Sequence, residues 1–383
     1  MDILTVDTEL ISKQIQTLSS KVNYWLFRAN GGQYYDDFNA GNFIGMGKNE
    51  ITVEEIKKYK GNTDALKATV HKLYPDDSRP GATAGQLQRF IYAMAIDDVV
   101  LVPSESSERY LIGHITSDVY TESDEDLLDR RRHSPYKKRR KVQWMGVIRR
   151  KDADPVLYKL VYAGHTMSNA NEYRGFINRA LLDTYITDGV VHSTYSVNQL
   201  TDIDMLDSST FSYAFARIYK NIFPEEKLVS KTNVQSLGPI EIIGGIAAVI
   251  MVSGFIAFSL RSELHELHLK FFGQSLTIVK GTSKKDRLWQ IEKEERKLAI
   301  KEQEAQDQHV KAVIDNIEKI QALSDSASDS MKRIDIHIPD ELLKAFSSST
   351  KKSLPENRDV ASSDTNTPSN QKTNQSNDRD KDQ

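Results

Sequence analysis

Short apolar and aromatic runs, separated by Gly, Asn and Pro, fill the first 150 positions of the chain. This pattern is typical of short β-strands joined by turns, and it predicts a small barrel. The expected strands are residues 24–28, 43–47, 98–102, 110–115 and 142–148. Two helices should lie between the second and third strands. One follows Thr52, which forms a capping box with Glu55, and the other covers residues 83–94. A short helix is expected before the first strand, within residues 1–22.

Helical spacing of apolar residues replaces this pattern after residue 155. Ser168 is expected to cap a helix whose apolar positions continue to Tyr185. A second helix is expected over residues 209–222, because Pro224 cannot continue it. Residues 156–235 are therefore predicted to form a small helical middle region.

An uncharged apolar run of 19 residues extends from Ile242 to Leu260. As a helix it would be about 28 Å long at 1.5 Å per residue, close to the roughly 30 Å of a bilayer core. Its Ser253 and Ser259 do not make a polar face, which an ordinary surface helix would keep. The run predicts a single membrane span. The alternative is a helix buried within protein.

A long polar helix is expected after the apolar run, from Asp286 to about Leu323. Its second half carries Val310, Val313, Ile317 and Ile320, spaced as in a coiled coil, and this seam predicts self-association. Residues 347–383 contain three aliphatic side chains among Ser, Asn, Asp, Lys and Gln. Such a segment cannot bury enough apolar surface to offset its ordering entropy, so a disordered tail is expected.

These patterns together predict an α+β fold: a small β-barrel, a helical region with one apolar helix, and a long polar helix. The expected divisions are residues 1–155, 156–235, 236–272, 286–346 and 347–383.

Composition narrows the class of protein. The net charge is −3, so a surface that binds polyanions must be local. The chain has no cysteine, which excludes disulfides and thiolate metal sites. Asp2, Asp7 and Glu9 stand where a signal peptide would carry basic residues, so secretion is not expected. The predicted location is the membrane, through a single span, or the cytoplasm.

Several short motifs follow one another in the predicted barrel. An opening strand carries Trp25 and Arg28 before a Gly-Gly pair, and a later strand carries the form Arg-x-x-x-Trp. The full series is Trp25, Arg28, Gly31-Gly32, Ile44-Gly45-Met46-Gly47, Asp98 to Pro103, Ile112-Gly113-His114-Ile115, Tyr120 and Arg140 to Trp144. In order and spacing it resembles the PUA/EVE-like reader domain of bacterial restriction-type proteins. Asp97 and Met46 depart from that family's Gly and Trp.

The resemblance implies a reader that stacks a base between aromatic rings. Trp25, Tyr120 and Trp144 are the candidate walls, and Arg28 and Lys48 are candidates to meet phosphate or a base edge. The alternative is that these rings fill the barrel core.

A strongly charged segment lies between the last two expected strands. Eight cations occur within twelve residues: Arg130, Arg131, Arg132, Lys137, Lys138, Arg139, Arg140 and Lys141. They are candidates to bind phosphates, with steep salt dependence. Five acidic residues between 122 and 129 offer the alternative of a hairpin whose two halves pair.

No catalytic motif, metal-ligand set or cofactor fingerprint stands out in the sequence. The leading hypothesis is a non-enzymatic sensor or adaptor that reads nucleic acid, and the resemblance implies a setting of bacterial conflict or phage defence. Two alternatives stay open. One is a membrane effector gated by a small ligand or partner, and the other is a restriction-type nuclease whose motif is not recognised.

Overall fold

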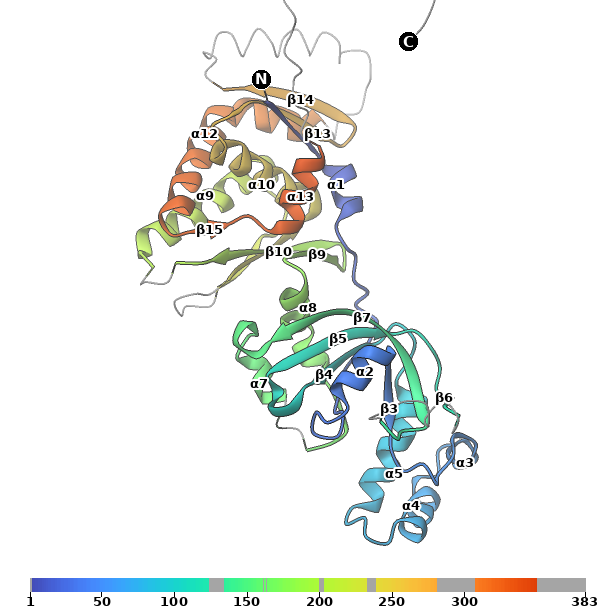
Figure 1. Ribbon diagram of the computed structural model, residues 1–383. Helices are drawn as coiled ribbons and strands as arrows, with labels where there is room; N and C mark the ends of the chain where they lie inside the picture. The colour runs from blue at the N-terminus through green and yellow to red at the C-terminus, as the bar shows by residue number, and fades with distance from the viewer. Residues whose placement is uncertain are drawn as a thin grey trace, which may run out of the picture.

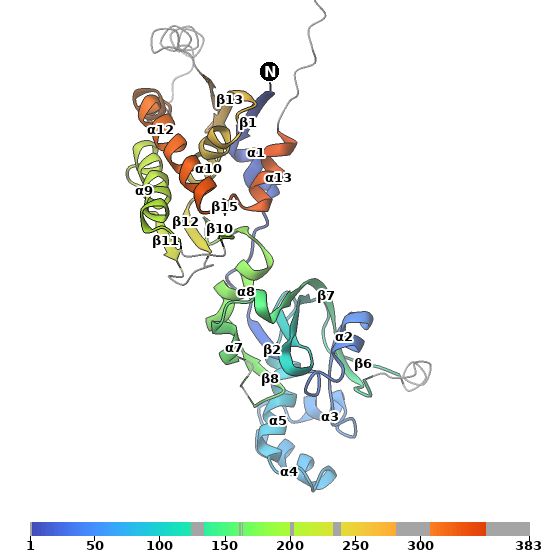
Figure 2. The ribbon, with the colours of Figure 1, turned by 60° about the vertical axis from the view of Figure 1, so that its left-hand side comes forward.

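The computed structural model describes residues 2–123, 134–160, 162, 164–199, 203–232, 239–280 and 307–349. These residues form two lobes, which both views show one above the other (Figures 1 and 2). Lobe A comprises residues 22–181. Lobe B comprises residues 2–18 and the described residues from 184 to 349. The chain therefore begins in lobe B, builds lobe A, and returns.

Lobe A contains a curled sheet whose strands follow the order β3-β7-β5-β4-β2-β8, with β6 paired to β7. All neighbours are antiparallel except β2 and β4, which are parallel. The strands are β2 (Tyr24–Phe27), β3 (Phe43–Met46), β4 (Val99–Pro103), β5 (Arg109–Ile115), β6 (Tyr120–Thr121), β7 (Lys138–Arg149) and β8 (Met167–Asn169).

The long strand β7 produces the curl of this sheet. Its first part pairs with β3 and β6, whereas residues 142–149 pair with β5. The register with β5 shifts between Ile112 and Gly113, as at a β-bulge. Bulges bend a strand and increase its twist, so one strand can serve both sides of a half-barrel.

Helices of lobe A cover one end and both faces of this sheet (Figure 1). Thr52 caps α3 as expected, because its Oγ1 accepts the Glu55 amide at 3.1 Å. The expected helix over residues 83–94 is α5 continued by the π-helical segment η1. The helical elements are α2 (Tyr35–Gly41), α3 (Val53–Lys58), α4 (Thr63–Leu73), α5 (Pro80–Gln88), η1 (Arg89–Ala93), α7 (Val156–Leu160), α8 (Arg174–Leu181) and the short turns η2 (Glu105–Ser107), η3 (Arg150–Asp152) and η4 (Asn171–Tyr173).

Lobe B packs helices between and around two sheets. One sheet has the order β1-β13-β14, and the other has the order β11-β12-β10-β15 with β9 paired to β10. Its elements are β1 (Asp2–Asp7), α1 (Thr8–Gln14), β9 (Thr184–Thr187), β10 (Val190–Val197), α9 (Met205–Ile222), β11 (Val229–Thr232), β12 (Ile240–Gly245), α10 (Ile246–Leu260), β13 (Leu264–Phe271), β14 (Gln274–Val279), α12 (Asp307–Arg333), β15 (Ile336–His337) and α13 (Asp340–Ser348).

The expectation of a membrane span at Ile242–Leu260 is wrong. The run is divided between the end of β12 and the 15-residue helix α10. Within the described ranges, no helix combines the length and apolarity that crossing a bilayer requires. Residues 248–258 of α10 are buried on every side of the helix. A helix enclosed by protein has no solvent face to keep polar, which explains its apolar sequence.

Three further local expectations differ from the structure. Residues 2–7 form a strand that pairs in parallel with β13, rather than part of a leading helix. Ser168 lies inside β8, and the following helix begins at Arg174. Tyr185, expected on that helix, lies in β9. For residues 2–7 and Ser168, pairing with a distant strand overrides the local pattern, whereas Tyr185 pairs with the adjacent strand β10.

The second half of the expected polar helix is α12. Its seam residues Val313 and Ile320 are fully buried in the apolar core of lobe B, where α12 packs against α9. This face of the helix therefore stabilises the fold of a single chain. Residues 286–306 and the expected disordered tail beyond Ser349 lie outside the described residues.

Candidate functional site

The expected aromatic walls have different surroundings. Trp25 is buried in β2, and its Nε1 donates to Asp98 Oδ2 at 2.7 Å. Asp98 is itself 2% exposed and also accepts the Asn23 amide. The Trp25 ring is therefore part of the core. Arg28, at the end of β2, is half-buried.

Three other expected residues do come together. Tyr120, Lys141 and Trp144 line a cavity of about 540 Å³ beside the β3–β7 edge, together with Asn42, Thr116 and Gln143. The bulge in β7 sets Trp144 over Gly113, where a Cβ would lie 2.7 Å from the indole ring. The Trp144 Nε1 donates to the Phe38 carbonyl at 3.1 Å, which fixes the ring.

Three of the expected phosphate-binding residues turn inward. Lys138, Arg139 and Arg140 in β7 are at most 5% exposed. Lys138 Nζ donates to the carbonyls of Lys48 and Ile51 at 2.8 and 2.9 Å. These side chains are occupied by the protein itself, so the structure does not place them where a phosphate could reach them.

Arg140 shows why these cations are buried. Its guanidinium donates to the carbonyls of Phe90, Ile91 and Ser117 at 3.0 to 3.1 Å. The first two belong to η1, whose irregular turn leaves carbonyls without the usual helical partners. Of the remaining expected cations, Lys141 is exposed, Lys137 is half-buried, and residues 130–132 lie outside the described residues.

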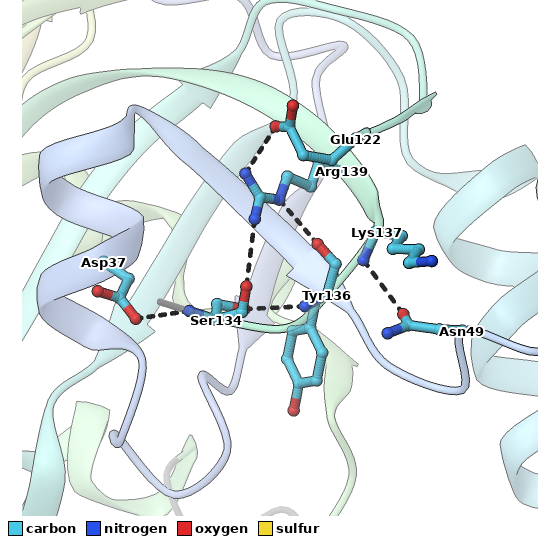
Figure 3. Close-up of polar contacts among 7 residues, drawn as sticks. All are labelled: Asp37, Asn49, Glu122, Ser134, Tyr136, Lys137 and Arg139. Atoms are coloured by element: carbon cyan, nitrogen blue, oxygen red, sulfur yellow. Dashed lines mark hydrogen bonds and ion pairs between the residues drawn. The ribbon is translucent and has the colours of Figure 1, made fainter. Parts of the chain in front are cut away.

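A polar network holds the segment that leads into β7 (Figure 3). At its centre Arg139 donates to the Tyr136 carbonyl at 2.7 Å, to the Ser134 carbonyl at 3.2 Å and to Glu122 at 2.6 Å. The network is completed by Asp37 accepting the Ser134 amide, Asn49 accepting the Lys137 amide, and Ser134 Oγ accepting the Tyr136 amide. The backbone of Tyr136 is therefore fixed on both sides.

Tyr136 forms one wall of a second cavity, the Tyr136 pocket, of about 370 Å³. It lies between the end of β3, the segment before β7, α5 and the residues before β8. Its lining residues are Met46, Gly47, Lys48, Arg79, Ala82, Thr83, Gln86, Leu87, Tyr136, Gly164, His165 and Thr166. Its volume falls within the roughly 300–1,000 Å³ of small-molecule sites.

The glycines of β3 explain how the ring reaches this position. A Cβ at Gly45 or Gly47 would lie 2.9 or 3.0 Å from Tyr136 atoms, so side chains there would displace it. Tyr34 supports the ring edge-on, at a centroid distance of 5.1 Å. The Ile-Gly-x-Gly motif thus provides a flat floor beneath an aromatic side chain.

Charged groups gather at the rim of the Tyr136 pocket. Lys48 pairs with Asp77 at 2.9 Å and lies over the Tyr74 ring at 4.3 Å. Asp77 also accepts the Thr83 hydroxyl at 2.8 Å and the Arg79 amide at 2.9 Å. Burial opposes ionisation of Asp77, but these donors and Lys48 outweigh it and hold its pKa below the usual range. The Arg79 side chain is exposed at the same rim.

The described residues contain no group of three His, Asp or Glu side chains that could hold a metal ion. His265 and His268, three positions apart, lie on strand β13. Glu226, in the acidic pair upstream of β11, accepts the Tyr219 hydroxyl at 2.8 Å. The candidate site is the Tyr136 pocket, which has an aromatic wall and the cations Lys48 and Arg79 at its rim.

A family model for a domain of unknown function (DUF8426) matches residues 26–166. The matched span runs from within β2 through β7 and contains every residue that lines the Tyr136 pocket. No curated protein matches the chain, and no solved structure matches it. The function must therefore be inferred from the geometry of the site.

The sequence made Lys48 a candidate phosphate contact beside Trp25, Tyr120 and Trp144, whereas the structure places it at the Tyr136 pocket. Tyr136, Thr83 and Gln86 were not expected at a site. Tyr136 lies within the basic segment 130–141, which was interpreted through its charges alone. The useful signal was the pair Gly45 and Gly47, since glycines spaced by two in a strand mark a close approach by another group.

Proposed function

We propose that lobe A is a reader domain that binds one unpaired or flipped nucleobase in the Tyr136 pocket. The observation that carries this proposal is the pocket itself: a cavity of about 370 Å³ with a fixed tyrosine ring at one side and Lys48 and Arg79 at the rim. Aromatic faces bind bases by stacking, and cations beside them meet the phosphates. The resemblance to PUA/EVE-like readers also implies base binding, with aromatic walls at Trp25, Tyr120 and Trp144 in place of Tyr136.

In this proposal the chain acts as a non-enzymatic sensor or adaptor. Lobe A binds the nucleic acid. A role in bacterial conflict or phage defence rests on the resemblance. The basic rim is small, so binding should depend on salt only modestly. Each phosphate contact to a single strand contributes a slope of about −0.7 in log affinity against log salt.

The test is binding of the full chain to single-stranded oligonucleotides, with modified and unmodified bases, followed by fluorescence anisotropy. Tyr136→Ala should weaken binding by about 1–3 kcal/mol if a base stacks on the ring, and Tyr136→Phe should retain it. Tyr213→Ala is the matched control, because Tyr213 is an exposed tyrosine on α9 of lobe B. A folded Tyr136→Ala variant with unchanged affinity would contradict the proposal.

Arg79 provides a second test of the same site. Arg79→Gln should reduce the salt slope by about 0.7 if its guanidinium meets one phosphate. Lys151→Gln, at an exposed cation in η3, is the control and should leave the slope unchanged. Equal slopes for the wild type and both variants would remove the rim from the binding surface.

A further inference from the structure

Gln86 is a buried amide in the wall of the Tyr136 pocket. It lies on α5 and is 7% exposed. Its Oε1 accepts the Met167 amide, at the start of β8, at 2.7 Å. Because a backbone N–H can only donate, the side-chain atom that faces it must be the carbonyl oxygen. This bond therefore fixes which way the amide is turned.

Within the described residues, the amide nitrogen of Gln86 has no hydrogen-bond partner. No hydrogen bond joins Nε2 to another residue in the described part of the chain, and the atom is not fully enclosed. An amide nitrogen carries two N–H donors and no acceptor. The pocket therefore contains a fixed donor on a buried side chain that can bond to a ligand.

The hydrogen bond from Met167 changes which base edges the Gln86 amide can recognise. Asn and Gln recognise adenine through two bonds, in which the amide oxygen accepts from the exocyclic amine and the nitrogen donates to a ring nitrogen. In Gln86 the oxygen already accepts one bond from Met167, whereas the nitrogen makes none within the described residues, so a ligand that accepts from the nitrogen satisfies this amide best. Lys48 and Arg79 at the rim are also donors, and the Asp77 carboxylate already accepts from Lys48 and Thr83. An exocyclic amine placed against Nε2 would therefore meet another donor.

We infer that Gln86 is a specificity-determining residue that selects bases with a keto group where adenine and cytosine carry an amine. This inference rests on the proposed function and names the class of base that the pocket binds. A keto oxygen accepts from Nε2, whereas an amine leaves two donors facing each other. A mismatch of this kind costs the desolvation of a buried polar group, which corresponds to roughly 5- to 100-fold in affinity.

The experiment measures binding of the full chain to four nucleoside monophosphates by calorimetry. Inosine and adenosine monophosphates form one pair, and uridine and cytidine monophosphates form the other. Within each pair the sugar and phosphate are the same, and a keto oxygen beside a ring N–H replaces an amine beside a ring-nitrogen acceptor. The keto member of each pair should bind about 5- to 100-fold more tightly.

Gln86→Glu separates the reading role from the structural one. One carboxylate oxygen can still accept the Met167 amide, so the melting temperature should stay close to that of the wild type. The other oxygen replaces a donor with an acceptor. The keto-to-amine affinity ratio should therefore fall below one, and the added negative charge should cancel from that ratio because every ligand carries the same phosphate.

The outcomes separate this inference from the proposed function. If none of the four ligands binds and oligonucleotide binding does not depend on Tyr136, the proposed function fails. If binding depends on Tyr136 but the keto-to-amine ratio is the same in the wild type and in Gln86→Glu, the role of Gln86 is overturned alone. A wild-type preference for the amine ligands would also overturn it.

Discussion

Lys138 is a cation that the fold holds almost entirely away from solvent. The residue is 2% exposed, and its ammonium group donates to two carbonyls of the loop after β3. Desolvation, with a smaller contribution from Lys137, lowers the pKa of Lys138 to about 8. The side chain closes the loop that begins at Lys48, whose backbone has a positive φ of 64°. At the scale of the residue, Lys138 was expected to bind phosphate, but its ammonium group instead holds the loop after β3 through two hydrogen bonds.

The lowered pKa of Lys138 predicts a pH effect of definite sign. The unfolded chain keeps the proton up to about pH 10.5, whereas the folded chain releases it near pH 8. Between these values the unfolded state binds more protons, so the contribution of Lys138 to stability rises with pH. Denaturant unfolding at pH 7 and pH 10 should show wild type gaining about 1–3 kcal/mol relative to Lys138→Met. A constant difference between the two proteins would contradict the assigned burial.

The basic strand β7 can be tested at the scale of the element. Arg140 is 1% exposed and satisfies three carbonyls, whereas its neighbour Lys141 is exposed. Arg140→Ala should destabilise the protein by about 3 kcal/mol or more, because it leaves buried acceptors unpaired. Lys141→Ala should change stability by less than about 0.5 kcal/mol. The measurement is the free energy of unfolding in denaturant, and similar values for the two variants would argue against a structural role for the strand.

Helix α10 gives a second prediction at this scale. A Cβ at Gly254 would lie 2.7 Å from a methyl group of Val6 in β1, so the helix and strand need this glycine to pack. Gly254→Ala should destabilise by about 1–3 kcal/mol, despite the better helix propensity of alanine.

The control for α10 is Gly175→Ala in α8, where nothing lies within 4 Å of the added carbon. That variant should stabilise the protein by about 0.4–1 kcal/mol, because it reduces the entropy of the unfolded chain. Thermal unfolding of the two variants should thus shift in opposite directions. A stabilised Gly254→Ala variant would contradict the close packing of α10 on β1.

The two lobes meet at a buried acidic residue. Glu241 of β12 is 2% exposed and pairs with His192 at 2.8 Å and with Arg179 of α8 at 3.4 Å. Arg179 also pairs with Asp154 of lobe A, and Lys231 approaches Glu241 at 3.9 Å. Helix α8 lies between the lobes in both views (Figures 1 and 2). At the scale of the molecule, one guanidinium connects a carboxylate from each lobe.

This junction should make the protein sensitive to acid. Burial opposes ionisation of Glu241, but the His192 hydrogen bond and the charges of Lys231, His192 and Arg179 outweigh it and lower its pKa below 4.5. A lowered carboxyl pKa contributes stability above the unfolded value, and this contribution is lost as the pH falls through the folded value. Glu241→Gln should cost about 3 kcal/mol at pH 7. The difference from wild type should shrink below pH 4.5, and a difference independent of pH would contradict this account.

The sequence by itself determined the α+β class, most strands of lobe A and the cap at Thr52, because strand alternation and capping are local properties. It also paired Tyr120 with Trp144, which line one cavity, but it grouped them with Trp25 and Lys48, which the structure places elsewhere. Only the tertiary structure decided whether an apolar run is membrane-spanning or buried, since both environments select the same residues. It likewise decided that Lys138, Arg139 and Arg140 face carbonyls instead of solvent. The direction of a side chain in a curled sheet depends on strands distant in sequence, and no local pattern records it.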